Sequence, residues 1–401
     1  MSPSKSDGEK GRSSGGRAPK PRATVPPGRH GGPGEDETDL DLETRLVDGL
    51  RPDRPELQRL VVPDERFPAL VKLAERHAVD GLLAAALTRA GTLGRLRAET
   101  ADVLRRAALR RHREWIELQR VLQDALGLLA GAGVPVIVLK GAALAIGTYA
   151  EPELRPMNDI DLLVPPDAVD VAAGALRSGG FLVPDEARTE FWKDAYFHLP
   201  LRAPGDGFVL VELHWAIAQP DRHRPDTTEL FGAAVPLAES TGAALMLGPE
   251  DMLTHLALHH SYHYFEPRLI WIHDLALLHL DPPPASHALA RARRWQATVP
   301  FLLALAQVER VFPGLLRPEF RQLAARSARV RWLLRLFGSG RPMPLFGGWS
   351  RRRTQLLLGS LMLDSPLQML RATAGWTRRS RRFGDRTGRR PEMSDPRRGA
   401  I

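Results

Sequence analysis

The stretch 136-VIVLKGAALAIGTYAEPELRPMNDIDLLVPP-166 decides the fold, because two short apolar runs in it carry charges that a protein core normally excludes. The first run, 134–140, is continuous and β-branched, which is typical of a buried strand. The second run, 158–164, predicts another strand, which ends at a pair of prolines. One lysine and two aspartates therefore lie where a folding chain would be expected to bury valine and leucine.

The sequence on both sides of this stretch predicts one small α/β unit between helical regions. A helix is expected to open at Gly141, and the runs FHLPLRA and FVLVELHWAI, joined around Gly205–Gly207, predict a hairpin. Before the unit, a long amphipathic pattern ends at Gly131 and Gly133; after it, Pro249 followed by two acids starts another helix. The fold class expected is α+β or α/β, a small mixed sheet flanked by helices. The predicted parts are a disordered tail at 1–38, a helical region at 39–130, the mixed-sheet core at 131–246, a helical domain at 247–340 and an Arg-rich helical or disordered tail at 341–401.

Charge and composition limit the classes of function. The formal net charge is +9, of which residues 1–38 hold +2 (7 − 5) and residues 376–401 hold +6 (9 − 3), so the body is left with about +1. A nearly neutral body argues against a nucleic-acid-binding core. The basic C-terminal end could touch an anionic membrane or RNA, but a solvated tail is the simpler interpretation.

The chain contains no cysteine, which excludes disulfides, thiolate metal sites and cysteine nucleophiles. The N-terminus shows no apolar run typical of a signal peptide, and no stretch reaches the length of a membrane span. We therefore expect a cytoplasmic protein without a transmembrane segment.

Three carboxylates are the candidate metal ligands. Asp159 and Asp161 project from one face of their strand, since residues i and i+2 of a strand share a face. Glu212 shares a face with His214 on the second hairpin strand, and would join the aspartates if that strand pairs beside theirs. Such a trio can hold two Mg²⁺ ions for phosphoryl displacement. The plainer alternative is that the acids keep edge strands soluble.

The Lys140-Gly141 turn is a candidate phosphate site. Glycine lets the backbone turn from strand to helix and approach a ligand closely, and a helix N-terminus offers free N–H groups to an anion. Lys140 would add a positive charge there. Alternatively, Lys140 only extends its ammonium group to solvent past an apolar surface.

Taken together, these motifs resemble an uncharacterised bacterial nucleotidyltransferase family within the DNA polymerase β-like superfamily. The resemblance covers roughly residues 60–300. The matching residues are Leu139-Lys140-Gly141, Tyr149, Pro152, Arg155, Asn158 to Val164, Gly180-Phe181, Val211 to Trp215, and the segments 75–87 and 251–274.

The resemblance implies a nucleotidyltransferase core in which Asp159, Asp161 and Glu212 bind two Mg²⁺ ions and a nucleoside triphosphate such as ATP is the donor. An acceptor hydroxyl of a small molecule, peptide or protein would take the nucleoside monophosphate, with release of pyrophosphate. Lys140, Gly141 and Arg155 would be expected near the phosphates. The further candidates for nucleotide contact are Asn158, His214, His259 and Asp274.

The histidine-rich segment 251–265 raises a rival hypothesis. His255 and His259 are four residues apart on one helical face and, with the His273-Asp274 dipeptide, could form the metal site of a His/Asp phosphohydrolase. The same residues could instead line the cleft or simply pack between helices. Two further alternatives to the transferase remain open: a non-catalytic protein that binds nucleotide or a partner, and a toxin–antitoxin component that modifies a protein.

Overall fold

Six short strands form one mixed sheet in the part of the chain that the computed structural model describes, residues 33–184, 192, 196–205, 209–238, 242–263, 265, 268–337 and 359–383. The order across the sheet is β3-β4-β2-β1-β6-β5. The strands are β1 (Ile137–Val138), β2 (Asp159–Leu163), β3 (His198–Arg202), β4 (Leu210–His214), β5 (Val235–Pro236) and β6 (Leu245–Met246).

Strand β2 lies in the middle of the sheet, and its pairing with both neighbours sets the positions of the candidate site residues. It runs parallel to β4 on one side and antiparallel to β1 on the other. Ile160, Leu162 and Leu163 are almost completely buried, so both faces of β2 are covered. Apolar side chains on both faces explain why this strand reads as an apolar run despite its acids.

The expected hairpin is present, since β3 and β4 pair antiparallel with His198 opposite His214. Gly205 follows β3 with a φ of +103°, a backbone region that favours glycine. Gly207, the other end of the predicted turn, lies outside the described residues.

The predicted strand at 134–140 is shorter than expected, because regular pairing is confined to Ile137 and Val138. Leu139 stays extended and donates its N–H to the carbonyl of Asp161 at 2.9 Å. Lys140 is the first residue of the helix that follows, instead of the last residue of the strand. The left-handed φ of Lys140, +46°, produces this early change of direction.

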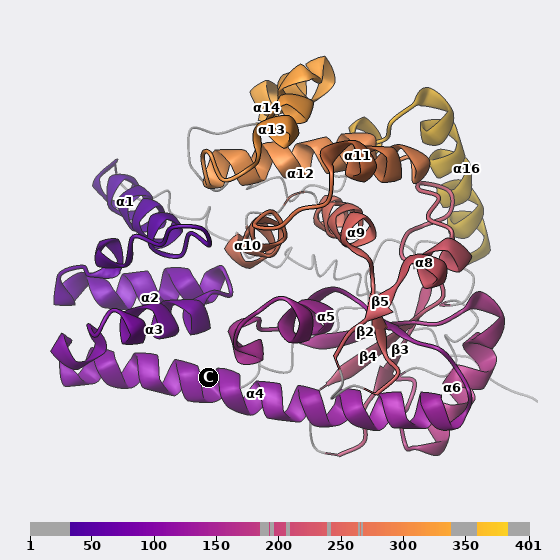
Figure 1. Cartoon of the computed structure of the whole chain (residues 1–401), viewed down its shortest axis with the longest axis horizontal. Coiled ribbons are helices and arrows are strands. Elements are labelled where there is room, and N and C mark those ends of the chain that lie inside the picture. The colour runs from indigo at the N-terminus through magenta and orange to yellow at the C-terminus, as the bar shows by residue number, and fades with distance from the viewer. Residues whose placement is uncertain are drawn as a thin grey trace, which may run out of the picture. The chain divides into compact units, whose positions relative to one another are not determined.

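Helices precede the sheet, as the periodicity predicts. Helix α4 is 34 residues long, and the left-handed Gly133 follows it, in agreement with the expected C-terminal glycines. It packs against α3 near its start, where the buried Asp80 accepts from Arg110 and Arg111, and against α6 and β2 further along (Figure 1). The helices of this region are α1 (Pro33–Gly49), α2 (Phe67–Arg76), α3 (Asp80–Arg89) and α4 (Ala98–Gly131).

Further helices lie within and after the sheet region, and α9 begins at Pro249 with two acids in its first turn, as expected. Helix α12 packs against α9, α10 and α13 to form a second helical layer (Figure 1). The helices are α5 (Lys140–Gly147), α6 (Val169–Ser178), α8 (Thr227–Ala233), α9 (Pro249–Tyr262), α10 (Leu269–Leu278), α11 (Ala285–Arg294), α12 (Thr298–Val311), α13 (Pro318–Arg326), α14 (Ala328–Phe337) and α16 (Pro366–Phe383).

The α/β fold class with flanking helices is thus confirmed. Contacts group Leu40–Ile401 as one compact unit, apart from Met1–Asp39, so the division at residues 131 and 247 stays a prediction. The expected N-terminal tail lies outside the described residues up to residue 32, and α1 begins at Pro33. No helix within the described ranges has the length and apolar character needed to cross a membrane.

Candidate active site

The pairing of β2 with β4 brings the three predicted carboxylates to one place on the sheet. Asp161 lies directly opposite Glu212 in the parallel register, and Asp159 precedes Asp161 by two residues on the same face. The expectation that the second hairpin strand lies beside the aspartate strand is therefore correct. Asp161 is 3% exposed, so its negative charge is buried away from water.

Lys140 supplies the positive charge of the site. Its Nζ lies 2.5 Å from Oδ1 of Asp161, and its side chain is 18% exposed. The left-handed backbone of Lys140 is costly for a residue with a side chain, and such strain is found mainly at functional sites. The turn from strand to helix that the sequence assigned to Gly141 is thus made at Lys140.

Gly141 has a different structural reason to lack a side chain. A Cβ there would lie 3.3 Å from Cβ of Met157 and 3.4 Å from Nη1 of Arg155. The glycine therefore allows α5 to pack tightly against the chain that leads into β2. Asn158, immediately before that strand, is exposed to solvent.

The pKa values of the two aspartates shift in opposite directions. Burial, followed by the negative charges of Asp161 and Glu212, raises the pKa of Asp159 to about 7. Burial would also raise the pKa of Asp161, but the Lys140 ammonium and the hydrogen bond from His214 bring it well below its ordinary value. Burial alone would lower the pKa of Lys140, yet the surrounding carboxylates raise it overall. Lys140 is thus a permanent cation, and Asp159 is the acid least compensated by protein groups.

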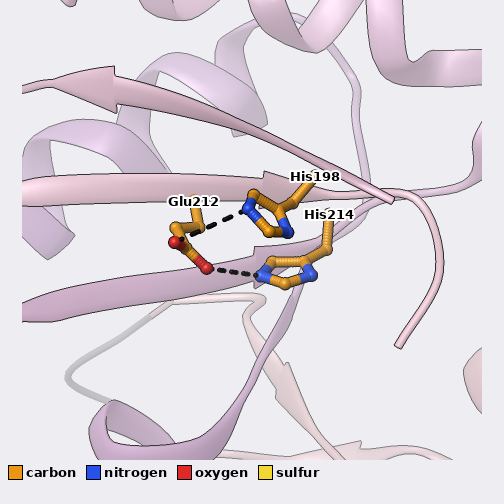
Figure 2. Close-up of side chains that lie close together, drawn as sticks. All are labelled: His198, Glu212 and His214. Carbon is orange, nitrogen blue, oxygen red and sulfur yellow. Dashed lines mark ion pairs between the residues drawn. The ribbon is translucent and has the colours of Figure 1, made fainter. Parts of the chain in front are cut away.

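Two histidines complete the carboxylate face. Nε2 of His214 lies 2.9 Å from Oδ1 of Asp161 and 3.3 Å from Oε2 of Glu212. His198, on the neighbouring strand β3, places its Nε2 3.7 Å from Oε1 of Glu212 (Figure 2). Burial lowers the pKa of His198 to about 4, so its imidazole is neutral at pH 7.

Sequence reasoning included His214 and missed His198. His198 is the second residue of the FHLPLRA run, and the antiparallel register of the hairpin shows that it faces His214. A count of alternate residues from the turn back along both strands could have found it.

His255 and His259 of α9 lie close enough to Lys140 for its charge to lower their pKa values. They do not form the metal clamp that their spacing suggested. His255 is 2% exposed, and neither of its ring nitrogens has a hydrogen-bond partner in the described residues. Burial, followed by the charge of Lys140, lowers its pKa to about 3. His259 packs instead against the rings of His263 and Trp271. Within the described ranges, neither His255 nor His259 belongs to a group of three side chains that could hold a metal.

Arg155 and Asp274 meet each other in a buried ion pair. Nε of Arg155 donates to Oδ1 and Oδ2 of Asp274 at 2.8 and 2.9 Å, and Nη2 lies 2.8 Å from Oδ2. Nη1 donates to the carbonyl of Pro156 at 2.5 Å, and the hydroxyl of Tyr149 donates to Oδ1 of Asp274 at 2.8 Å. Every nitrogen of the guanidinium group therefore has a protein partner.

The residues fit a divalent cation. Three carboxylates on one face of two adjacent strands offer the oxygen ligands that Mg²⁺ prefers, and burial makes their repulsion costly unless a cation accompanies them. Lys140 contacts Asp161 and leaves the charge of Asp159 less compensated, which is why the pKa of Asp159 is raised. A bound cation would supply the missing positive charge.

A family model described as "Uncharacterised nucleotidyltransferase" matches residues 63–313, more than half of the chain. Neither the curated proteins nor the solved structures provide a match. The chain therefore belongs to this nucleotidyltransferase family, and the resemblance on which the sequence analysis rested is confirmed. The protein is an enzyme of the class that transfers phosphorus-containing groups, and a nucleotide is its substrate.

Proposed function

We propose that this nucleotidyltransferase moves a nucleoside monophosphate from a nucleoside triphosphate to a hydroxyl of a small molecule, peptide or protein, with release of pyrophosphate. Mg²⁺ is the proposed cofactor, and two ions are expected. The observation that carries the proposal is the placement of Asp161 opposite Glu212, with Asp159 on the same face and Lys140 beside them.

Asp159, Asp161 and Glu212 would hold the metal ions. When bound, the metal supplies Lewis-acid chemistry: it neutralises charge on the triphosphate and lowers the pKa of the acceptor hydroxyl. Asp159 is the natural first ligand, since it is the carboxylate with the least compensation from the protein.

Lys140 would bind the triphosphate. Its ammonium is permanently charged and lies at the start of α5, where free backbone N–H groups also favour an anion. In the structure that ammonium contacts Asp161, so it also holds the acidic face together before nucleotide binds. Asn158, exposed at the edge of the site, is placed to donate a hydrogen bond to the nucleotide.

Arg155 and Asp274 would hold the site in place and would not contact the nucleotide, because their polar atoms already contact each other and their neighbours. Their pair joins the chain before β2 to α10, and so fixes the segment that carries Asn158 and Asp159. His255 and His259 would form the wall of the acceptor side on α9.

The direct test is incorporation of label from α-³²P-labelled ATP, GTP, CTP and UTP into acceptors from a lysate of the source organism. We expect label transfer with one triphosphate preferred, pyrophosphate release in equal amount, and loss of both with a chelator. Release of free nucleoside monophosphate alone, without a labelled acceptor, would contradict transfer and favour hydrolysis.

Replacing Lys140 with Met is expected to raise the KM for the triphosphate by about 10- to 100-fold, because the substitution keeps an unbranched side chain of nearly the same length and removes its charge. Steady-state kinetics with varied triphosphate would measure the effect. Lys72→Met, an exposed lysine on α2, is the matched control and should leave KM unchanged. An unchanged KM in Lys140→Met would remove Lys140 from the phosphate site.

A further inference from the structure

The face of the β3–β4 hairpin carries a second set of ligand atoms, which differs in chemistry from the three carboxylates. His198 on β3 lies opposite His214 on β4, and their ring centroids are 4.9 Å apart. Glu212 precedes His214 by two residues and projects from the same face. Figure 2 shows the carboxylate of Glu212 directed at both imidazoles.

The spacing of the ligand atoms suits a metal ion. One ligand atom from each of the three side chains lies within 4.8 Å of the other two. Two ligands that are each about 2.1 Å from a tetrahedral ion lie about 3.4 Å apart. The nitrogen–oxygen distances here are 3.3 Å from His214 and 3.7 Å from His198 to Glu212. The second distance is too long for a hydrogen bond, yet it is close to that separation.

Aromatic side chains hold His198 in place. Its ring packs near the rings of Trp192, Tyr196 and Phe197, at centroid distances of 5.9, 5.7 and 5.5 Å. An apolar wall of this kind restricts the rotamers of the imidazole and excludes water from one side of the site. The other side stays partly open, since the side chains of His198 and Glu212 are 16% and 18% exposed.

We propose that His198, Glu212 and His214 bind one divalent transition-metal ion, with Zn²⁺ preferred to Mg²⁺. Two imidazoles and one carboxylate form the ligand set of many catalytic zinc sites, with a further position left for water or substrate. Mg²⁺ selects oxygen ligands, whereas imidazole suits Zn²⁺ and its neighbours in the first transition row. This proposal depends on the geometry of the hairpin and is independent of the proposed nucleotide transfer. The site does share Glu212 with the proposed Mg²⁺ ligands.

A competing explanation is that His214 serves as an internal cation between Asp161 and Glu212, while His198 only packs against it. The two explanations differ at His198. If His198 is a ligand, its removal abolishes tight Zn²⁺ binding; if it only packs, Zn²⁺ binding does not depend on it.

The test is a calorimetric titration of the whole protein, freed of metal by a chelator, with Zn²⁺ in excess Mg²⁺. We expect one equivalent of Zn²⁺ to bind. His198→Ala and His198→Gln should each weaken that binding by at least about 100-fold. Co²⁺ provides a second readout, because its visible spectrum reports the number and kind of ligands. His287→Ala, an exposed histidine on α11, should change neither titration nor spectrum.

The proposal is overturned if Zn²⁺ fails to bind in excess Mg²⁺, or if both folded His198 variants bind it as tightly as the original protein. Circular dichroism checks the fold, and His198→Gln retains a polar side chain of similar size in case His198→Ala does not fold. Label transfer in Mg²⁺ alone tests the proposed function separately. Its absence beside intact, His198-dependent Zn²⁺ binding would reject the transfer and support this site.

Discussion

Replacing Asp161 with Asn should lower the rate of metal-dependent nucleotide transfer by at least about 1,000-fold. The substitution keeps the shape of the side chain and removes one carboxylate from the metal face. A catalytic metal contributes several kcal/mol of transition-state stabilisation, and each 1.36 kcal/mol is worth a factor of ten in rate. Asp161 also accepts from Lys140 and His214, so the change weakens two further contacts of the site. Label transfer under saturating triphosphate is the measurement.

Two further variants make the result specific. Asp159→Asn removes a carboxylate for which no contact to Lys140 is observed, and it should also inactivate the enzyme if metal binding is the cause. Asp167→Asn, the same change at an exposed position just after β2, should have no effect. Transfer within about tenfold of the original rate in Asp161→Asn would exclude this carboxylate as a metal ligand, since a lost ligand costs far more.

The sequence was sufficient to find β1 to β4 and their acids because these follow local rules, whereas β5 and β6, of two residues each, were not predicted. A strand places alternate residues on one face, so Asp159 and Asp161 had to lie together. The Gly-rich turn required the runs before and after it to pair as a hairpin, and Glu212 followed from the position of that hairpin beside β2. These inferences needed only periodicities of two residues and one strand pairing.

The features that sequence reasoning missed depend on where strand pairing stops, on exact hairpin register or on tertiary packing. The left-handed backbone at Lys140 arises where β1 stops after two paired residues, and nothing local requires glycine's conformation at a lysine. The facing of His198 and His214 needs the hairpin register to the exact residue. The histidines of α9, in contrast, looked like a metal clamp by spacing, but packing turned His259 toward the ring of Trp271.

The ion pair between Arg155 and Asp274 also could not be predicted from the sequence. Separated by 119 positions in the chain, they looked in sequence like two independent groups that could contact nucleotide. Folding brings them together, 7% and 1% exposed, with Tyr149 as a further donor. A buried guanidinium with a complete set of partners is positioned to support the site, and that assignment has a measurable consequence.

Replacing Asp274 with Ala is expected to lower the free energy of unfolding by about 3–5 kcal/mol, because it leaves the Arg155 charge and the Tyr149 hydroxyl buried without their shared acceptor. Chemical denaturation at pH 7 would measure the loss. An exposed pair gives the matched control: Asp102→Ala removes the partner of Arg105, the two side chains being 52% and 57% exposed, and should cost no more than about 1 kcal/mol.

The double variant Arg155→Met with Asp274→Leu decides between support and direct nucleotide contact. Removing both charges together relieves the unpaired guanidinium, so much of the lost stability should return relative to Asp274→Ala. If the pair only supports the site, the double variant should also regain most of its affinity for triphosphate, measured by calorimetry. A stable double variant that binds triphosphate at least about 100-fold more weakly would instead place Arg155 on the phosphates, because positional support would then have been restored without restoring binding.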